Sequence, residues 1–128
     1  DPQSTFTTAA SSNQTGGDLV PMLWYVMDDI TIDSVVAIEG ADAATGDTTR
    51  MHLMSYTYSS GATSTLTGGT VLAYNSDVTN AGAEQTYKST FTIGSSDVDA
   101  GKVILAFLRS DSINSDYSVN MYIKYHLR

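Results

Sequence analysis

The side chains best suited to acid–base or metal chemistry in this chain are two histidines and a set of carboxylates. His52 and His126 lie far apart in the sequence and match neither the HxH nor the HxxxH spacing that places two imidazoles on one metal ion. Both lie in stretches that alternate like β-strands. We therefore expect them at the surface or in a subunit interface, and we expect no metal site.

Of the 14 acidic residues, only Glu39 and Glu84 are glutamates. A glycosidase needs two carboxylates that flank a groove, but Glu39 is predicted on a strand and Glu84 in a loop. Asp97 and Asp99 come closest to a calcium pair, because alternate loop residues can face one ion. Turn formation is the alternative explanation for the aspartates. No nucleophile elbow, phosphate loop or dinucleotide motif is present, so we expect neither an enzyme nor a cofactor.

The composition narrows the class of partner. The net charge of −8 argues against nucleic acid and against anionic membranes as partners. No apolar run is long enough for membrane insertion, no signal peptide is visible, and there is no cysteine. The core must therefore hold without disulfides, alone or with the help of oligomerisation. The chain begins at Asp1-Pro2, as a processed product or an excised domain would.

The organisation predicted is one domain preceded by an arm. Residues 1–18 are rich in Ser and Thr and end in Gly16-Gly17, which is typical of an N-terminal arm or linker. Phe6 is the only large apolar anchor of this arm, and we expect it to dock on its own domain or on a neighbouring subunit. Residues 19–128 form a single domain.

Within this domain, alternating apolar residues between turn-forming stretches predict about seven to eight strands. Gly68-Gly69 indicates a bulge or bend. One short helical turn is expected near residues 96–100, capped by Ser95 or Ser96 and ended by Gly101. The pattern is typical of an all-β fold, an antiparallel β-sandwich that is jelly-roll-like. Strands are expected at residues 19–27, 30–39, 50–58, 66–74, 85–93, 102–110 and 117–128.

The faces of these strands carry the remaining expectations. On the strand at 30–39, the alternation predicts one apolar face made of Ile30, Ile32, Val36 and Ile38. The strands at 19–27 and 102–110 are apolar on both faces, which indicates either central strands or self-association. Pro21 places the first of them at an edge or after a bend.

The last strand, residues 117–128, has the cleanest alternation. Its apolar face should pack on the core and consists of Tyr117, Val119, Met121, Ile123, Tyr125 and Leu127. The other face ends in Lys124, His126 and Arg128. These basic groups either guard a sheet edge or meet the acidic loops of a neighbouring subunit.

Aromatic residues supply the other candidate contacts. Such side chains can pack on their own sheet, bury in a subunit interface or stack on a sugar. Together with Phe6 and the three basic residues, the candidate interface or ligand contacts are Trp24, Tyr56, Tyr58 and Tyr122.

Four segments together resemble β-sandwich domains of bacteriophage virion proteins, of the fibre-head or capsid-decoration type. They are DITIDSVVAIEGAD, TTRMHLMSYTY, QTYKSTFTIGSSDVDAGKVILAFLRSDS and YSVNMYIKYHLR, and the resemblance covers residues 28–128. It implies a jelly-roll-like protomer, a homo-oligomer for which a trimer is favoured, and a structural role or a host-surface contact. It transfers no site residues.

Sequence and resemblance together predict a non-enzymatic structural protein of a virus particle, located in the virion. Its expected partners are further copies of itself, other virion proteins and a host surface glycan. The alternative is a carbohydrate-binding module with a tyrosine-lined groove.

Overall fold

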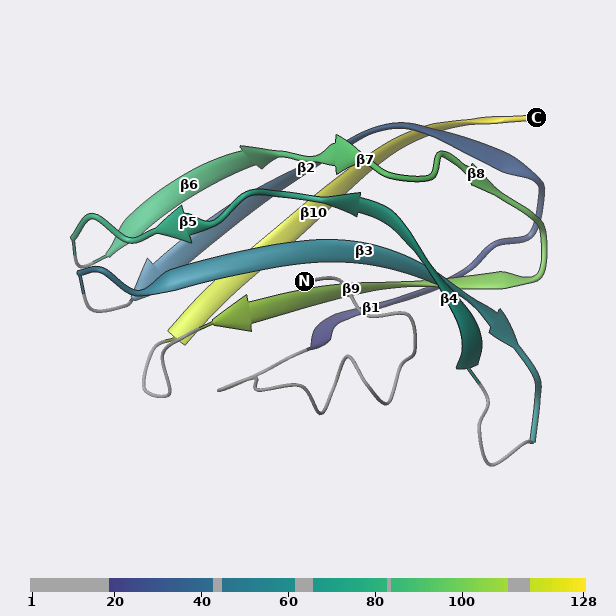
Figure 1. The fold of residues 1–128 in the computed structure, drawn as a ribbon, viewed down its shortest axis with the longest axis horizontal. Coiled ribbons are helices and arrows are strands. Elements are labelled where there is room, and N and C mark those ends of the chain that lie inside the picture. The colour runs from purple at the N-terminus through teal and green to yellow at the C-terminus, as the bar shows by residue number, and fades with distance from the viewer. Residues whose placement is uncertain (1–18, 43–44, 62–65, 83, 111–115) are drawn as a thin grey trace.

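The chain folds into two antiparallel β-sheets, and the part that the structure describes contains no helix. The structure is a computed structural model that describes residues 19–42, 45–61, 66–82, 84–110 and 116–128. Figure 1 shows β10 of one sheet running diagonally across β3 of the other. The arrangement is that of a β-sandwich and confirms the all-β, antiparallel class.

The larger sheet, here sheet A, has the strand order β1-β9-β3-β4-β7, and the short β5 also pairs with β3. The doubly apolar β9 is an inner strand of this sheet, whereas β1 lies at its edge, as Pro21 predicted. The strands are β1 (Leu19–Tyr25), β3 (Thr48–Tyr58), β4 (Leu66–Tyr74), β5 (Val78–Thr79), β7 (Thr92–Ile93) and β9 (Lys102–Ser110).

The smaller sheet, sheet B, has the order β10-β2-β6, and the short β8 also pairs with β2. Its strands are β2 (Ile30–Asp42), β6 (Gln85–Thr90), β8 (Asp97–Val98) and β10 (Asp116–Leu127). The last strand pairs with β2 along its whole length, from Asp116 opposite Asp42 to Leu127 opposite Ile30. Sheet B is therefore built around segments that are far apart in the sequence.

The two sheets are joined at one side and open at the other. Phe91 alone separates β6 of sheet B from β7 of sheet A, and its backbone N–H donates to Val35 at 2.9 Å. At the other side lie β1, an end strand of sheet A, and β10, an end strand of sheet B. They approach each other through the rings of Trp24 and Tyr125, whose centroids are 5.0 Å apart. We call this side, formed by β1 and β10, the open edge.

The main core fills the space between the sheets. Sheet B contributes Ile30, Ile32, Val35 and Ala37, all at most 2 % exposed. The apolar face predicted for β10 packs on this core only in part. Val119, Met121 and Ile123 contact the core and are partly buried, whereas Tyr125 and Leu127 are exposed, which corrects the prediction for the end of the strand. Buried side chains of this kind stabilise the fold by removing apolar surface from water. The core therefore thins toward the open edge.

A second apolar cluster lies on the other face of sheet A. Its members alternate with main-core residues along β3 and β9, because successive side chains of a strand point to opposite faces. No second layer of strands packs over this face within the described ranges. The cluster consists of Met54, Tyr56, Val103, Leu105 and Phe107, all at most 2 % exposed.

Three local expectations can now be compared with the structure. The bend at Gly68-Gly69 is confirmed, because the β3–β4 register shifts between Ser55 and Thr57 and Gly68 has a φ of 60°. The helical turn near 96–100 is wrong. Asp97 and Val98 instead pair with β2. The Asp97 carboxylate also accepts a hydrogen bond from the Thr31 hydroxyl at 2.8 Å.

The face predicted for β2 is also only half right. Ile32 lies opposite Tyr125 and Ser34 opposite Lys124, which leaves Asp33 as an extra, bulged residue. A bulge reverses the alternation beyond it. Val35, Ala37 and Glu39 therefore point into the core, whereas Val36 and Ile38 are only half-buried.

Candidate interaction surface

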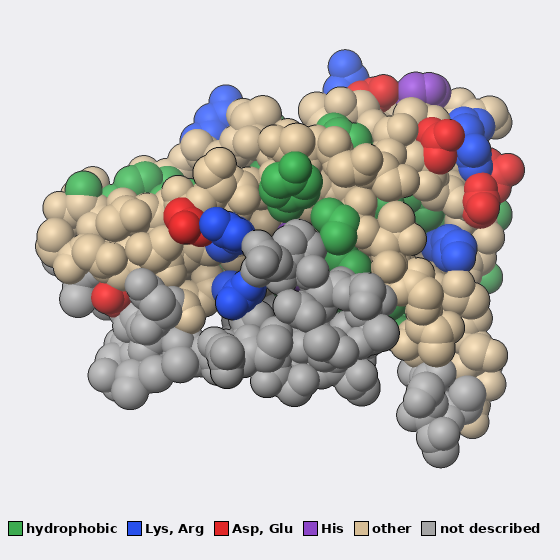
Figure 2. All heavy atoms as spheres, in the orientation of Figure 1, with side chains coloured by type: hydrophobic (Ala, Val, Ile, Leu, Met, Phe, Trp, Pro, Cys, Tyr) green, Lys and Arg blue, Asp and Glu red, His purple; other side chains and the backbone are tan. Residues whose placement is uncertain are grey.

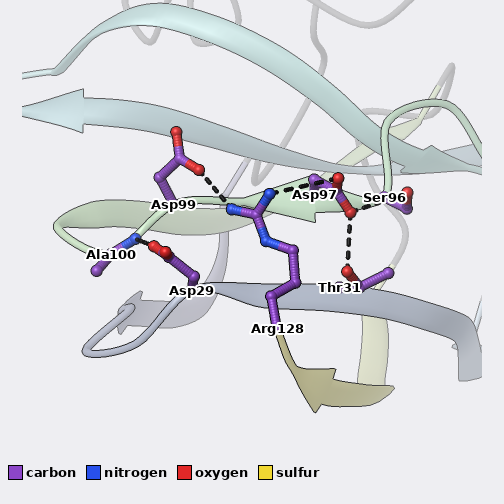
Figure 3. Close-up of polar contacts among 7 residues, drawn as sticks. All are labelled: Asp29, Thr31, Ser96, Asp97, Asp99, Ala100 and Arg128. Atoms are coloured by element: carbon purple, nitrogen blue, oxygen red, sulfur yellow. Dashed lines mark hydrogen bonds and ion pairs between the residues drawn. The ribbon is translucent and has the colours of Figure 1, made fainter.

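The charged groups at the end of β10 are engaged within the chain. The Arg128 guanidinium donates to Asp99 at 2.5 Å and to Asp97 at 3.4 Å (Figure 3). Beside it, Asp29 accepts the backbone N–H of Ala100 at 2.8 Å. Figure 2 shows acidic and basic side chains gathered at the end of the molecule where β8 and the C-terminus lie in Figure 1. Arg128 thus ties the last strand to the β8 turn, a role that the sequence did not predict for Asp97 and Asp99.

His126 is engaged in a similar way. Its Nδ1 atom lies 2.9 Å from a carboxylate oxygen of Asp33, the bulged residue of β2. The bulge is what turns this aspartate toward the neighbouring strand. Both side chains are accessible to solvent, so this pair links β2 and β10 at the surface. A surface position is one of the two that the sequence predicted for His126.

The carboxylates do not gather into a metal site in the described part of the chain. No group of three or more His, Cys, Asp or Glu residues there has the arrangement that would hold an ion. The described residues also include no helix long and apolar enough to cross a membrane.

Glu39 lies on a strand as predicted, but the sequence did not predict that its side chain is buried. It is 1 % exposed, between the sheets, where Thr49 of β3 donates to both of its oxygens at 2.7 and 3.0 Å. Burial raises the pKa of Glu39, and the hydrogen bond from Thr49 opposes this. The bond links sheet B to sheet A. The bulge at Asp33 places Glu39 inside, and the sequence has no motif that signals it.

His52 is the second polar residue found inside rather than at the surface. It is 1 % exposed on the outer face of sheet A and stacks on Phe107 with 4.9 Å between ring centroids. Neither ring nitrogen has a hydrogen-bond partner in the described structure. Burial, with the positive charge of Arg109 adding to it, lowers the pKa of His52 to about 4. His52 is therefore a neutral ring that packs against the second apolar cluster through Phe107.

The aromatic candidates separate into buried and exposed residues. Tyr56 is fully buried, and burial raises its pKa to about 12, so it is a core residue and not a surface contact. Tyr58 is 45 % exposed and meets Tyr25 edge-on at 6.2 Å. Both tyrosines line a groove of about 520 Å³ on the outer face of sheet A. The other lining residues are Leu23, Leu66 and Val103.

The remaining candidates meet at the open edge. Eight large hydrophobic side chains are exposed in the described structure, and six of them belong to β1, to β10 or to the residue Met27 just after β1. Tyr122 is exposed on β10, and Trp24 is half-buried against Tyr125. The six residues are Leu23, Tyr25, Met27, Tyr122, Tyr125 and Leu127, with exposed fractions from 47 to 77 %.

The structure brings some of the predicted contact residues together and separates others. Trp24, Tyr122 and Lys124 lie on the open-edge strands, and Tyr58 lies in the groove beside them. Lys124 is exposed and has no ion-pair partner in the described residues. Phe6 lies outside the described residues. What the sequence missed is that the edge positions, rather than a groove or a loop, hold most of the exposed apolar side chains.

In comparisons with known proteins, no protein-family model, no curated protein and no solved structure matches the chain.

Proposed function

We propose that this domain is a non-enzymatic structural protein of a virus particle, as a capsid-decoration or fibre-head domain, and that it assembles with copies of itself through the open edge. The protomer proposed is jelly-roll-like. The location proposed is the virion, with other virion proteins as further partners. The sequence resemblance supports the role in a virus particle. The exposed apolar side chains of the open edge support self-assembly.

The observation that carries self-assembly is the concentration of exposed apolar side chains on β1 and β10. Large apolar patches on a domain surface mark interaction sites, whereas single exposed hydrophobics are ordinary. On these two strands Leu23 is 70 % exposed and Leu127 is 63 % exposed, and the core residues Trp24, Val119, Met121 and Ile123 are only partly buried. A second chain placed there would remove both sets from water.

Light scattering on the purified chain tests this proposal. We expect an oligomer at micromolar concentration, weakened by Leu23→Ser with Leu127→Ser, because both side chains are largely exposed and add little to the fold of one protomer. Tyr74→Ser is the matched control, since Tyr74 is exposed on β4, away from the open edge. A wild-type monomer at micromolar concentration would contradict self-assembly.

A carbohydrate-binding module is the second candidate, supported by the pair Tyr25 and Tyr58 in the groove. Aromatic rings can pack on the apolar faces of a sugar, but specificity also needs several polar groups. Beyond the two hydroxyls, the groove is lined by Leu23, Leu66 and Val103, which suits an apolar side chain better. Fluorescence titration with a glycan panel checks this candidate. A response that Tyr58→Ala abolishes would favour it over protein binding, and no response across the panel would remove it.

A further inference from the structure

The face of sheet B that points away from the core is accessible. Within the described ranges no strand packs over it. Residues paired between antiparallel strands have their side chains on the same face, so this face consists of rows that run across the three long strands. We call it the outer face of sheet B. From β10 through β2 to β6, its rows are Ser118, Gly40 and Thr86; then Asn120, Ile38 and Lys88; then Tyr122, Val36 and Thr90; and finally Lys124 with Ser34.

This face is positively charged on a chain whose net charge is −8. Lys88 and Lys124 are exposed on it, and none of its rows contains an acidic residue. Glu39 of β2 points into the core, and Asp33, which precedes the last row, is engaged by His126 at 2.9 Å. Charge complementarity therefore favours an anionic partner for this face.

The two lysines of this face also differ from the other basic residues of the chain. Lys88 and Lys124 have no ion-pair or hydrogen-bond partner among the described residues. The other four basic side chains each take part in an ion pair, a hydrogen bond or another electrostatic interaction: Arg50, Lys102, Arg109 and Arg128. The two cations that the fold leaves unpaired thus lie on one face.

Tyr122 lies on this face in the row between the two lysines, and it is 58 % exposed. With about 3.4 Å per residue along a strand and about 4.8 Å between strands, the Cα atoms of Lys88 and Lys124 are roughly 17 Å apart. This spacing suits an extended ligand with at least two anionic groups better than a single small anion. The exposed ring can pack on the apolar face of a sugar, and Asn120 and Thr90 beside it can exchange hydrogen bonds with hydroxyl groups.

The composition of the face separates a glycan from other anionic partners. Protein interfaces are depleted of lysine and serine and enriched in aromatic residues and arginine, whereas this face has two lysines, several hydroxyl side chains and one aromatic ring. Single-stranded nucleic acid stacks its successive bases on several aromatic side chains, and here Tyr122 is the one ring in the rows. An acidic sugar chain needs only the groups that are present.

We propose that the outer face of sheet B binds an acidic oligosaccharide. Lys88 and Lys124 contact its carboxylate or sulfate groups, and the Tyr122 ring packs on a sugar between them. This site goes beyond the proposed self-assembly, whose test uses Leu23 and Leu127 of the open edge. Tyr122 belongs to an open-edge strand, but its side chain lies on the same face as that of Val36, which points away from the core.

Calorimetric titration of the full chain tests the ligand class. The probes are oligogalacturonate, which carries carboxylates, a heparin oligosaccharide, which also carries sulfates, and the neutral maltoheptaose. We expect at least one acidic probe to bind, and its affinity to fall as salt is raised, because exposed charges are screened. The probe that binds identifies the anionic group. No binding of either acidic probe, or equally tight binding of maltoheptaose, overturns the proposal.

Lysine variants test whether the site is on this face. Lys88→Gln and Lys124→Gln should each raise the Kd about three- to fivefold, the scale of one exposed ion pair, and the double variant should raise it roughly tenfold or more. Both side chains are exposed, so the fold tolerates these changes. Lys102→Gln is the matched control, because it changes the net charge equally but lies on β9 of sheet A. An equal loss in Lys102→Gln would show attraction by overall charge and overturn the site.

Tyrosine variants separate this face from the groove on sheet A. Tyr122→Ala should raise the Kd roughly tenfold, because the ring packs on the sugar. Tyr58→Ala is the matched control, since Tyr58 is similarly exposed but lines the groove, and it should leave the Kd unchanged. The reverse result would place the glycan in the groove and overturn the site on sheet B.

Two further results would assign the face to another partner. Binding of a single-stranded oligothymidylate as tightly as the acidic glycan would indicate nucleic acid. A change of oligomeric state in Lys88→Gln, followed by light scattering, would indicate a subunit contact. Either result overturns glycan binding. A monomeric wild type that binds the acidic probe would instead overturn self-assembly and leave this site intact.

Discussion

The outer faces of the two sheets differ sharply, although both sheets cover the same core. Sheet A is apolar on both faces, with Phe107 and Leu105 almost fully buried on the face that points away from sheet B. Sheet B turns polar and half-buried residues outward, among them Lys88 and Asn120, and even its inner face contains Glu39. Buried apolar surface is therefore concentrated in sheet A, whereas sheet B keeps one accessible face.

The largest expected effect tests the outer cluster of sheet A. Phe107→Ala should lower the free energy of unfolding by about 3–5 kcal/mol, because it removes a fully buried aromatic ring and leaves a cavity. Lys88→Ala, on the exposed outer face of sheet B, should change it by less than about 0.5 kcal/mol. Urea denaturation measures both. Equal changes in the free energy of unfolding would show that the two outer faces contribute equally to stability.

His52 tests the same cluster through pH. Its pKa is lowered from 6.5 to about 4, so the folded state disfavours its protonation, and stability is lost as pH falls from 6.5 to 4. The loss should approach about 3 kcal/mol near pH 4. His52→Phe should remove this part of the pH dependence and stack on Phe107 in the same place.

The comparison is best made with His126→Gln in both proteins, so that His52 is the one histidine by which they differ and no other is present. Thermal melts between pH 7 and pH 4 then isolate His52. Curves that stay parallel over this window would show that His52 is not a buried neutral group.

Glu39 tests the polar inner face of sheet B. Because burial raises its pKa above 4.5, its ionisation costs stability as pH rises through the folded-state pKa. Glu39→Gln should therefore stabilise the protein at neutral pH and have little effect below pH 4.5. Thr49→Val should destabilise the wild type by about 1–3 kcal/mol and the Glu39→Gln variant by less. A loss of stability in Glu39→Gln at pH 7 would mean that the fold favours the carboxylate.

The smallest effect is expected at the end of β10. Arg128→Gln removes the ion pairs to Asp97 and Asp99, which lie at the surface. The melting temperature should fall slightly at low salt and differ little from wild type in 1 M salt, because exposed pairs are screened. Calorimetry at both salt concentrations measures this. A large loss that persists in high salt would assign Arg128 a packing role.

The sequence predicted the strands well where alternation is uninterrupted. The face of β10 with Val119 and Met121 packs on the core as expected, and the doubly apolar β9 is an inner strand. Turn chemistry was less reliable. Ser, Asp and Gly near residue 98 suit a helix cap locally, but pairing with β2 and the Arg128 contacts determine the conformation.

The candidate surface was harder to predict because it depends on strand order. Alternation cannot tell an edge strand from an inner one, so it could not show that β1 and β10 lie on the same side. The single bulge at Asp33 also reversed the faces of β2 and moved Glu39 inside. One inserted residue therefore changed which side chains are available, and no composition or motif signals such an insertion.

The pairing of β10 with β2 also sets an order of events for folding. Positions 30–42 remain without this neighbour until positions 116–127 are present, since the two strands are separated by most of the chain. The β1–β9 pairing is similarly distant in sequence. Domains dominated by such contacts fold in milliseconds to seconds, because a long loop must close before the contacts form. During synthesis, the edge of β2 that pairs with β10 would stay without its neighbour until the last strand emerges.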